Sequence, residues 1–113
     1  MSPSAREYLR HILDEVQYIL AHSQNIDKSE FLQDETLKRA FVRSIEIIGE
    51  AAKKVPTSVR QEHPEIEWRA IMGMRDHLVR GYFGIDYDIV WDVVSNKVRE
   101  LGRHVQRILS TGS

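Results

Sequence analysis

Hydrophobic residues recur at intervals of three and four along the first half of the chain, which is the spacing of helices that bury one face. Ser4 followed three residues later by Glu7 is the pattern of a capping box, and the stripe behind it predicts a helix over residues 4–23. Asp27 can cap a short turn, and a longer stripe then predicts a helix that stops before Pro56, because proline removes a helical hydrogen bond. The two stripes consist of Leu9, Ile12, Leu13, Val16, Ile19 and Leu20, and of Leu37, Phe41, Ile45, Ile48, Ala52 and Val55.

The second half of the chain shows the helical period twice more. One stripe predicts a helix over residues 67–82 that ends near Gly81 and Gly84, since glycine is common where helices end. Asp86 is a good N-cap for a last helix that keeps its period until Gly112. These stripes consist of Trp68, Ile71, Met72, Leu78, Val79 and Tyr82, and of Val90, Val94, Val98, Leu101, Val105 and Ile108.

The four predicted helices define an all-α fold. No strand-like alternation or internal repeat interrupts them, and the connections are short, so neighbouring helices should pack antiparallel. Residues 56–64 begin and end with proline, which favours a short helix or a tight joint there. We therefore predict one domain over residues 1–113, an up-and-down four-helix bundle with a short extra helix. Apolar residues off the main stripes, namely Ile47, Trp91 and Val93, suggest a homodimer that buries them.

Composition excludes several classes of protein. The 113 residues are 42% hydrophobic and 29% charged, a balance typical of a folded domain. No apolar run approaches the roughly 18 residues of a membrane span, and the first residues lack the order of a signal peptide, so we expect a cytoplasmic protein with no membrane contact. The absence of cysteine excludes disulfides and thiolate chemistry. A net charge of -1 means that any RNA binding must come from a local cluster of Arg and Lys.

The five histidines are scattered along the chain. A metal ion needs ligands that converge to about 2 Å. His11 and His22 share a helical face but stand roughly 16 Å apart at about 1.5 Å per residue. We therefore expect no metal site, and we interpret as surface or partly buried groups His11, His22, His63, His77 and His104.

Two charged clusters have ordinary explanations. Arg99, Arg103 and Arg107 line one helical face and could follow a phosphate backbone, but cations near a helix C-terminus also complement the helix dipole. Glu46 and Glu50 lie one turn apart and could form a paired-carboxylate site, although a solvated or arginine-paired face is the simpler interpretation. Neither cluster decides the function alone.

The segment GMRDHLVRGYFGID, residues 73–86, places Arg75, Arg80 and Tyr82 near the end of a predicted helix. Together with HPEIEWRAIM before it, DYDIVW at its end and the earlier RSIEIIGEAAKKV, this segment resembles the HepT-like branch of the HEPN superfamily over nearly the full chain. That family carries an Arg, four residues, a His, one residue and a Tyr. Here Arg75 and Tyr82 match the motif, and Arg80 occupies the histidine position.

The resemblance implies a homodimer in which two copies of the motif face each other and form a metal-independent endoribonuclease site made of Arg75, Arg80 and Tyr82. A guanidinium can hold the scissile phosphate, so Arg75 fits that role, with Asp76 and Arg80 as further residues of the phosphate site. An imidazole can exchange the proton of the ribose 2′-OH, whereas a guanidinium stays protonated at physiological pH. The resemblance implies the ribonuclease toxin of a bacterial toxin–antitoxin pair. We therefore expect the fold of that toxin with weak or absent cleavage, because Arg80 cannot act as the general base.

His77 and Asp76 offer alternative roles within the same segment. At about 100° per residue, His77 lies roughly 160° from Arg75 around a helix and points away, unless a dimer mate or a distorted helix brings it back. Asp76 stands one turn before Arg80 and could simply pair with it.

Tyr82 has a structural and a functional interpretation. An aromatic residue at this spacing would ordinarily pack in the core or in a dimer seam. The resemblance implies instead that Tyr82 is AMPylated by a cognate minimal nucleotidyltransferase antitoxin, which uses ATP, while the chain itself needs no cofactor. An AMP group beside Arg75 would occupy the phosphate site and block RNA.

Three functions remain open from the sequence. The first is a ribonuclease toxin that acts on single-stranded or loop RNA. The second is a non-catalytic HEPN module that binds a nucleotidyltransferase partner or a nucleotide, which Arg80 favours. The third is a plain helical dimerisation domain in which Arg75 and Asp76 form surface pairs only.

Overall fold

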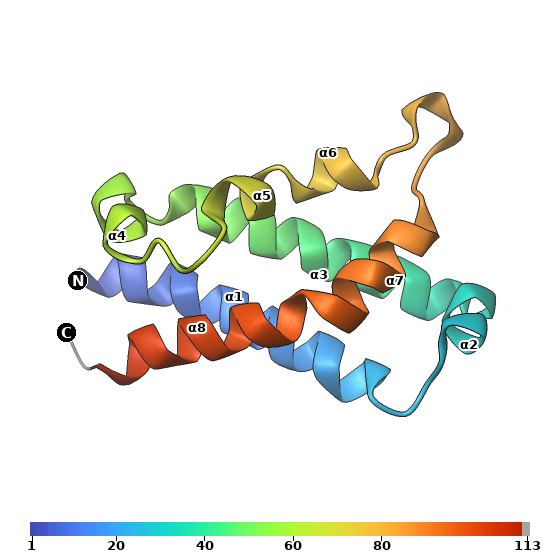
Figure 1. Cartoon of the computed structure of the whole chain (residues 1–113), viewed down its shortest axis with the longest axis horizontal. Helices are drawn as coiled ribbons and strands as arrows, with labels where there is room; N and C mark the ends of the chain where they lie inside the picture. The colour runs from blue at the N-terminus through green and yellow to red at the C-terminus, as the bar shows by residue number, and fades with distance from the viewer. Residues whose placement is uncertain (112–113) are drawn as a thin grey trace.

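The computed structural model describes residues 1–111, apart from the side chain of Phe83, and it is an all-α bundle (Figure 1). The chain runs along α1, returns along α3, goes back along α5 and α6, and returns along α7 and α8, so both ends of the described chain lie together (Figure 1). This order confirms the predicted up-and-down four-helix fold class. The elements are α1 Pro3–Ser23, α2 Lys28–Gln33, α3 Glu35–Lys54, α4 Thr57–Glu62, α5 Trp68–Met72, α6 Met74–Leu78, the 3-10 turn η1 Gly81–Phe83, α7 Tyr87–Asn96 and α8 Val98–Ser110.

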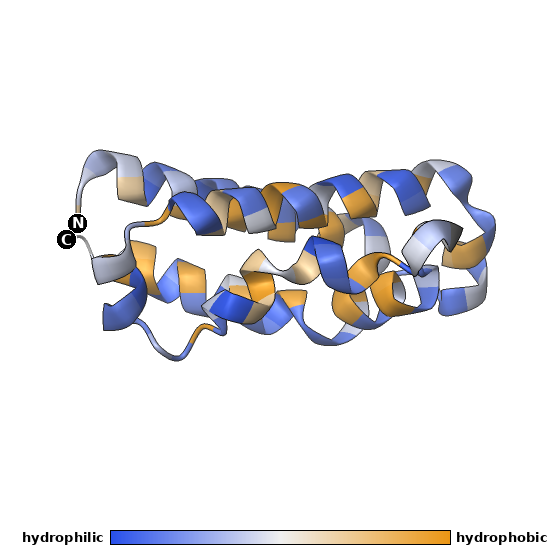
Figure 2. Ribbon diagram, turned by 90° about the horizontal axis from the view of Figure 1, so that it is seen from above, coloured by the Kyte–Doolittle hydropathy of each residue, from blue (hydrophilic) through white to orange (hydrophobic). Residues whose placement is uncertain are grey.

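The core is formed by the apolar stripes of the long helices. Hydrophobic and hydrophilic residues alternate around these helices, as Figure 2 shows. Each large apolar side chain that is buried contributes about 1.5–3 kcal/mol to folding. None of the helices in residues 1–111 combines the length and apolar character needed to cross a membrane. The largest fully buried side chains are Phe31, Phe41, Leu9, Ile12, Ile19, Leu78, Val16, Val55, Val90 and Val105.

The first helix begins earlier than the sequence pattern predicted. Ser2, not Ser4, is the N-cap, and its hydroxyl accepts a hydrogen bond of 3.2 Å from the backbone N–H of Ala5. Pro3 occupies the first helical position, where its fixed φ suits the helix and its missing N–H has no cost. The expected Ser4–Glu7 capping box is therefore wrong, because Ser4 already lies inside α1.

Aspartates cap the next two helices, Asp27 as expected and Asp34 without having been predicted. Asp27 caps α2 in a full capping box, in which its carboxylate accepts from the N–H of Glu30 at 2.8 Å and the Glu30 carboxylate accepts from the N–H of Asp27 at 3.1 Å. Asp34 caps α3 by accepting from the N–H of Leu37 at 3.0 Å. Because α3 ends at Lys54, its predicted stop before Pro56 is confirmed.

Aromatic side chains join α2 to α3 and α7. The ring of Phe31 stacks on Phe41 at 5.6 Å between centroids and lies 5.2 Å from the ring of Trp91. Trp91 is thus half-buried within one chain, and Val93 is buried in the core. Our inference that Trp91 and Val93 form leftover apolar surface is wrong, because Phe31 of α2 packs against Trp91, and Val93 is only 5% exposed on the side of α7 that faces α5 and α6. The homodimer stays a prediction that no longer rests on these side chains.

The last predicted helix is divided in two. Asp86 caps α7 as expected, but the backbone of Lys97 departs from helical geometry, with φ -117° and ψ -39°, and α8 begins at Val98. The N–H of Lys97 still donates to the carbonyl of Val93 at 2.9 Å, so the break is local. The spacing of apolar residues continues across Lys97, so the sequence pattern could not predict this break. The predicted end at Gly112 lies outside the described residues.

Candidate functional site

The segment that carries the motif is not one helix. Gly73 separates α5 from α6, and Val79 is extended, with φ -84° and ψ 130°. Glycine is among the poorest helix formers, and a β-branched side chain restricts its own rotamers in a helix. The predicted single helix over residues 67–82 is therefore wrong, because it is interrupted at Gly73 and ends at Leu78.

Residues 79–85 form a short hairpin-like loop at one end of the bundle. Val79 pairs with Ile85 in an isolated antiparallel bridge, and the N–H of Arg80 donates to the carbonyl of Gly84 at 2.6 Å. Gly84 has φ 89° and ψ -145°, a backbone conformation that residues other than glycine rarely adopt. The loop projects from the body of the molecule (Figure 1). The second half of the motif therefore sits on a turn whose shape is fixed by its own backbone bonds.

Arg75 lies on α6 and contacts α3. Its Nε donates to Oε2 of Glu46 at 2.8 Å, although the Arg75 side chain is 70% exposed. The other carboxylate oxygen of Glu46 lies 3.8 Å from Nη1 of Arg43, and the same nitrogen lies 3.5 Å from Oε1 of Glu50. The interpretation of Glu46 and Glu50 as an arginine-paired face is confirmed. Arg75 is thus held at its Nε while most of its side chain remains open to solvent.

Arg80 pairs with a different carboxylate from the one expected. Its Nε lies 3.8 Å from Oδ2 of Asp86, whose Oδ1 accepts from the backbone N–H of Asp88 at 3.0 Å as the α7 cap. The predicted pairing with Asp76 does not form, because α6 ends before Arg80 and the two residues no longer lie one helical turn apart. The Arg80 side chain is 66% exposed, so this ion pair is a weak one.

Tyr82 lies in η1 and is 93% exposed. The expectation that it packs in the core of its own chain is therefore wrong. Because α6 ends at Leu78, Tyr82 does not share a helix with Arg75 either. Its side chain is within reach of an approaching partner.

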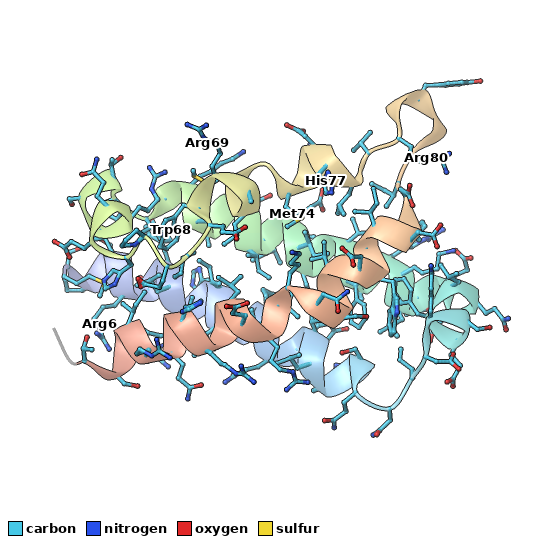
Figure 3. All side chains as sticks on the ribbon, in the orientation of Figure 1. Arg6, Trp68, Arg69, Met74, His77 and Arg80 are labelled. Atoms are coloured by element: carbon cyan, nitrogen blue, oxygen red, sulfur yellow. The ribbon has the colours of Figure 1, made fainter. Side chains whose placement is uncertain are left out.

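His77 faces a groove and not Glu46 of α3, which contacts Arg75. The groove has a volume of about 560 Å³, lies between α5–α6 and α7–α8, and is lined by both His77 and His104. Figure 3 shows the side chain of His77 on the side of α6 nearest α7, whereas Arg69 points outward. Arg75 contacts Glu46 on α3 instead. These neighbouring side chains of α6 therefore face different surroundings within one chain.

The other candidate residues lie apart from this segment. His11, His63 and His104 each lie within 3.9 Å of one carboxylate, and Nδ1 of His22 lies 2.9 Å from the carbonyl of Tyr18. Across residues 1–111, no three side chains of His, Asp or Glu gather as metal ligands would. The three arginines of α8 are all exposed: Arg99, Arg103 and Arg107.

Sequence reasoning named Glu46 and Asp86 but missed that these two carboxylates pair with the motif arginines. Glu46 and Arg75 are separated by 29 residues, so no local spacing connects them. Asp86 was recognised only as a helix cap, although the glycine-rich turn before it folds the chain back toward Arg80. A turn predicted at Gly81 and Gly84 would have indicated this second contact.

Comparison with known proteins gives a consistent result. A family model described as ribonuclease HepT-like matches residues 11–108. A candidate RNase of Caldanaerobacter subterraneus is 43% identical over 104 residues, covering 92% of this chain and 93% of that protein. A probable ribonuclease HepT of Thermococcus cleftensis is 37% identical over 101 residues, covering 89% of this chain and 92% of that protein. No solved structure matches the chain.

Proposed function

This chain belongs to the ribonuclease HepT-like family, and on that basis we propose that it is the toxin of a toxin–antitoxin pair whose RNA site is built from residues 74–86. The observation that carries this proposal is Arg75, whose guanidinium is exposed yet tied to Glu46 at 2.8 Å. A charged group that is both accessible and oriented suits the binding of a phosphate. Arg80 and Tyr82 follow on the projecting loop and complete the site.

The proposed reaction is metal-independent cleavage of the RNA backbone. The ribose 2′-oxygen attacks the adjacent phosphorus as its proton moves to a base, and the bond to the 5′-oxygen breaks as that oxygen takes up a proton. Arg75 donates N–H groups to the phosphate oxygens and stabilises the charge that develops there. Arg80 adds positive charge but cannot accept the proton, so cleavage by this sequence is slow or absent.

A second copy of the chain completes the site in this proposal. The family resemblance supports a homodimer in which the two 74–86 segments face each other. The projecting loop also supports it, since Arg80 and Tyr82 are 66% and 93% exposed within one chain. Two such segments would form a cationic slot for a single-stranded RNA, whose unstacked nucleotides can enter it. A cytoplasmic location fits this role and remains a prediction.

The Arg80→His variant should cleave single-stranded RNA in the presence of EDTA. The expected products carry a 2′,3′-cyclic phosphate, because the nucleophile is the 2′-oxygen. An RNA with 2′-O-methyl groups throughout is the matched control and should stay intact. Cleavage that disappears with EDTA, or that proceeds equally on the methylated RNA, would contradict the proposed chemistry.

Tyr82 is the proposed site of regulation by a nucleotidyltransferase partner. Its phenol oxygen attacks the α-phosphorus of ATP, forming a phosphodiester to AMP and releasing pyrophosphate, while the phenol proton passes to solvent. The 93% exposure of Tyr82 supports this role, because a transferase must surround the acceptor group. The added phosphate charge and adenosine would then compete with RNA for the arginines.

Co-expression of this chain with its cognate nucleotidyltransferase should increase the mass of the Tyr82 peptide by AMP units. Mass spectrometry of the purified chain measures this directly. Tyr82→Phe removes the acceptor oxygen while keeping the ring, so its peptide should be unmodified. An unmodified Tyr82 in a fully neutralised chain would indicate inhibition by binding alone.

A second candidate function is a non-catalytic HEPN module that binds a nucleotidyltransferase partner or a nucleotide. One observation favours it: Arg80 stands at the motif histidine position and is paired with Asp86 at 3.8 Å. On this alternative, Arg75 and Arg80 bind phosphate groups without cleaving RNA. Growth arrest on expression of the Arg80→His variant favours the ribonuclease over this alternative.

A further inference from the structure

Glu46 is the side chain that fixes the direction of Arg75. It lies on α3 and is 22% exposed, whereas the Arg75 side chain is 70% exposed. The 2.8 Å between Nε of Arg75 and Oε2 of Glu46 is a short, charge-assisted hydrogen bond. The more buried partner in this pair is therefore the carboxylate.

The contact uses only one edge of the guanidinium. A guanidinium has five N–H donors in a planar fork, and Nε carries one of them. Among the described side chains, Glu46 contacts Arg75 through Nε and leaves the two terminal nitrogens without a carboxylate partner. Those terminal N–H groups are the ones that can bind two oxygens of a phosphate together.

We propose that Glu46 is a positioning residue of the RNA site, which holds Arg75 by its Nε so that its terminal N–H groups are directed at the scissile phosphate. This inference rests on the proposed ribonuclease function and adds a residue that the family motif does not contain. Glu46 itself touches neither RNA nor the reacting atoms. It acts through Arg75.

A second arginine lies on the other side of the Glu46 carboxylate. Nη1 of Arg43 lies 3.8 Å from Oε1, the carboxylate oxygen of Glu46 that Arg75 does not use. Arg43 and Glu50 share the same face of α3 as Glu46, because they lie three residues before it and four after it. The Glu46 carboxylate thus lies between two arginines, and its short contact is the one with Arg75.

The geometry argues against a competing role for Glu46. A carboxylate that blocked RNA would cover the terminal fork of Arg75 in a two-point contact, since that is the edge phosphate uses. The observed single contact at Nε does not cover it. Loss of Glu46 should therefore impair the site rather than release it.

Cleavage kinetics in the Arg80→His background test the positioning role. Glu46→Ala should lower kcat about 10²-fold, the effect expected of a misplaced catalytic group, with a smaller change in KM. Glu46→Gln keeps an oxygen that accepts from Nε and should recover most of the loss. Glu7→Ala removes an exposed carboxylate from a pair on α1, with His11 at 3.9 Å, and should leave the rate unchanged. A Glu46→Ala variant that cleaves at an unchanged or faster rate overturns the inference. A Glu46→Gln variant that is as slow as Glu46→Ala overturns it as well.

The Nε–H signal of Arg75 in nuclear magnetic resonance tests the contact without any cleavage. In the chain as it stands, this proton should exchange slowly with water, and the Arg75→Lys variant assigns it. Glu46→Ala should lose the protection, while Glu46→Gln and Glu7→Ala should keep it. If the Arg80→His parent cleaves RNA but Glu46→Ala leaves the Arg75 signal protected, only the positioning inference fails. If the parent cleaves no RNA, the proposed function fails, and the role of Glu46 fails with it.

Discussion

Replacement of Arg80 by His should raise the rate of RNA cleavage about 10²- to 10⁴-fold, the usual contribution of a positioned general acid or base. The guanidinium now at this position stays protonated near neutral pH and cannot accept a proton, whereas an imidazole titrates at about pH 6.5. Arg80 also lies on a loop held by the Val79–Ile85 bridge, so the substitution should leave the loop intact. Initial rates on a fluorescent single-stranded RNA measure the change.

Two controls separate the new base from the loss of the arginine. Arg80→Gln removes the same guanidinium and its ion pair with Asp86 but supplies no titrating group, so it should stay as slow as the parent chain. The Arg80→His rate should depend on pH around the titration of the imidazole, and the parent rate should not. A parent chain that cleaves as fast as the Arg80→His variant would show that the missing histidine is not the limiting feature.

Phe31→Ala should lower the free energy of unfolding by about 3–5 kcal/mol, as large aromatic deletions in a packed core do. Phe31 is fully buried, and its ring lies 5.6 Å from Phe41 and 5.2 Å from Trp91. Removal of the Phe31 ring therefore eliminates the ring contacts by which α2 packs against both α3 and α7. For a domain of this size, such a loss is a large part of the total stability.

Urea unfolding followed by circular dichroism measures this effect. Leu32→Ala changes the next residue of the same short helix, which is only half-buried, and should cost clearly less. Because α7 begins directly after the motif loop, Phe31→Ala should also loosen the loop before the bundle unfolds. Equal losses for Phe31→Ala and Leu32→Ala would show that the aromatic cluster has no special role.

The fold could be predicted from sequence where one physical signal was strong. The apolar stripes of α1 and α3 continue for about three and about five turns, and the stop before Pro56 has a steric cause. Helix starts were less certain, because Ser2 and Ser4 are both good caps and the neighbouring Pro3 decided between them. The break at Lys97 left the apolar period intact and gave no signal.

At the candidate site, the helical spacing of apolar residues gave a wrong prediction, namely one helix over residues 67–82. Leu78, Val79 and Tyr82 continue a stripe on paper, yet Gly73, Gly81 and Gly84 weaken the helix around them. The residues of the motif were identified by resemblance, but their surroundings were not. The contact of Arg75 with Glu46 depends on how α6 lies across α3, and spacing along the chain cannot report that.

The most direct test of the central claim compares the RNA cleavage rates of the Arg80→His variant and the Arg75→Ala/Arg80→His double variant. If Arg75 holds the scissile phosphate, the double variant should be slower by about 10²- to 10³-fold, the usual loss when one donor to a developing charge is removed. Both proteins should unfold at similar temperatures, because the Arg75 side chain is 70% exposed and an ion pair of such a group contributes little to stability. Equal cleavage rates would place the chemistry elsewhere on the molecule and contradict the account.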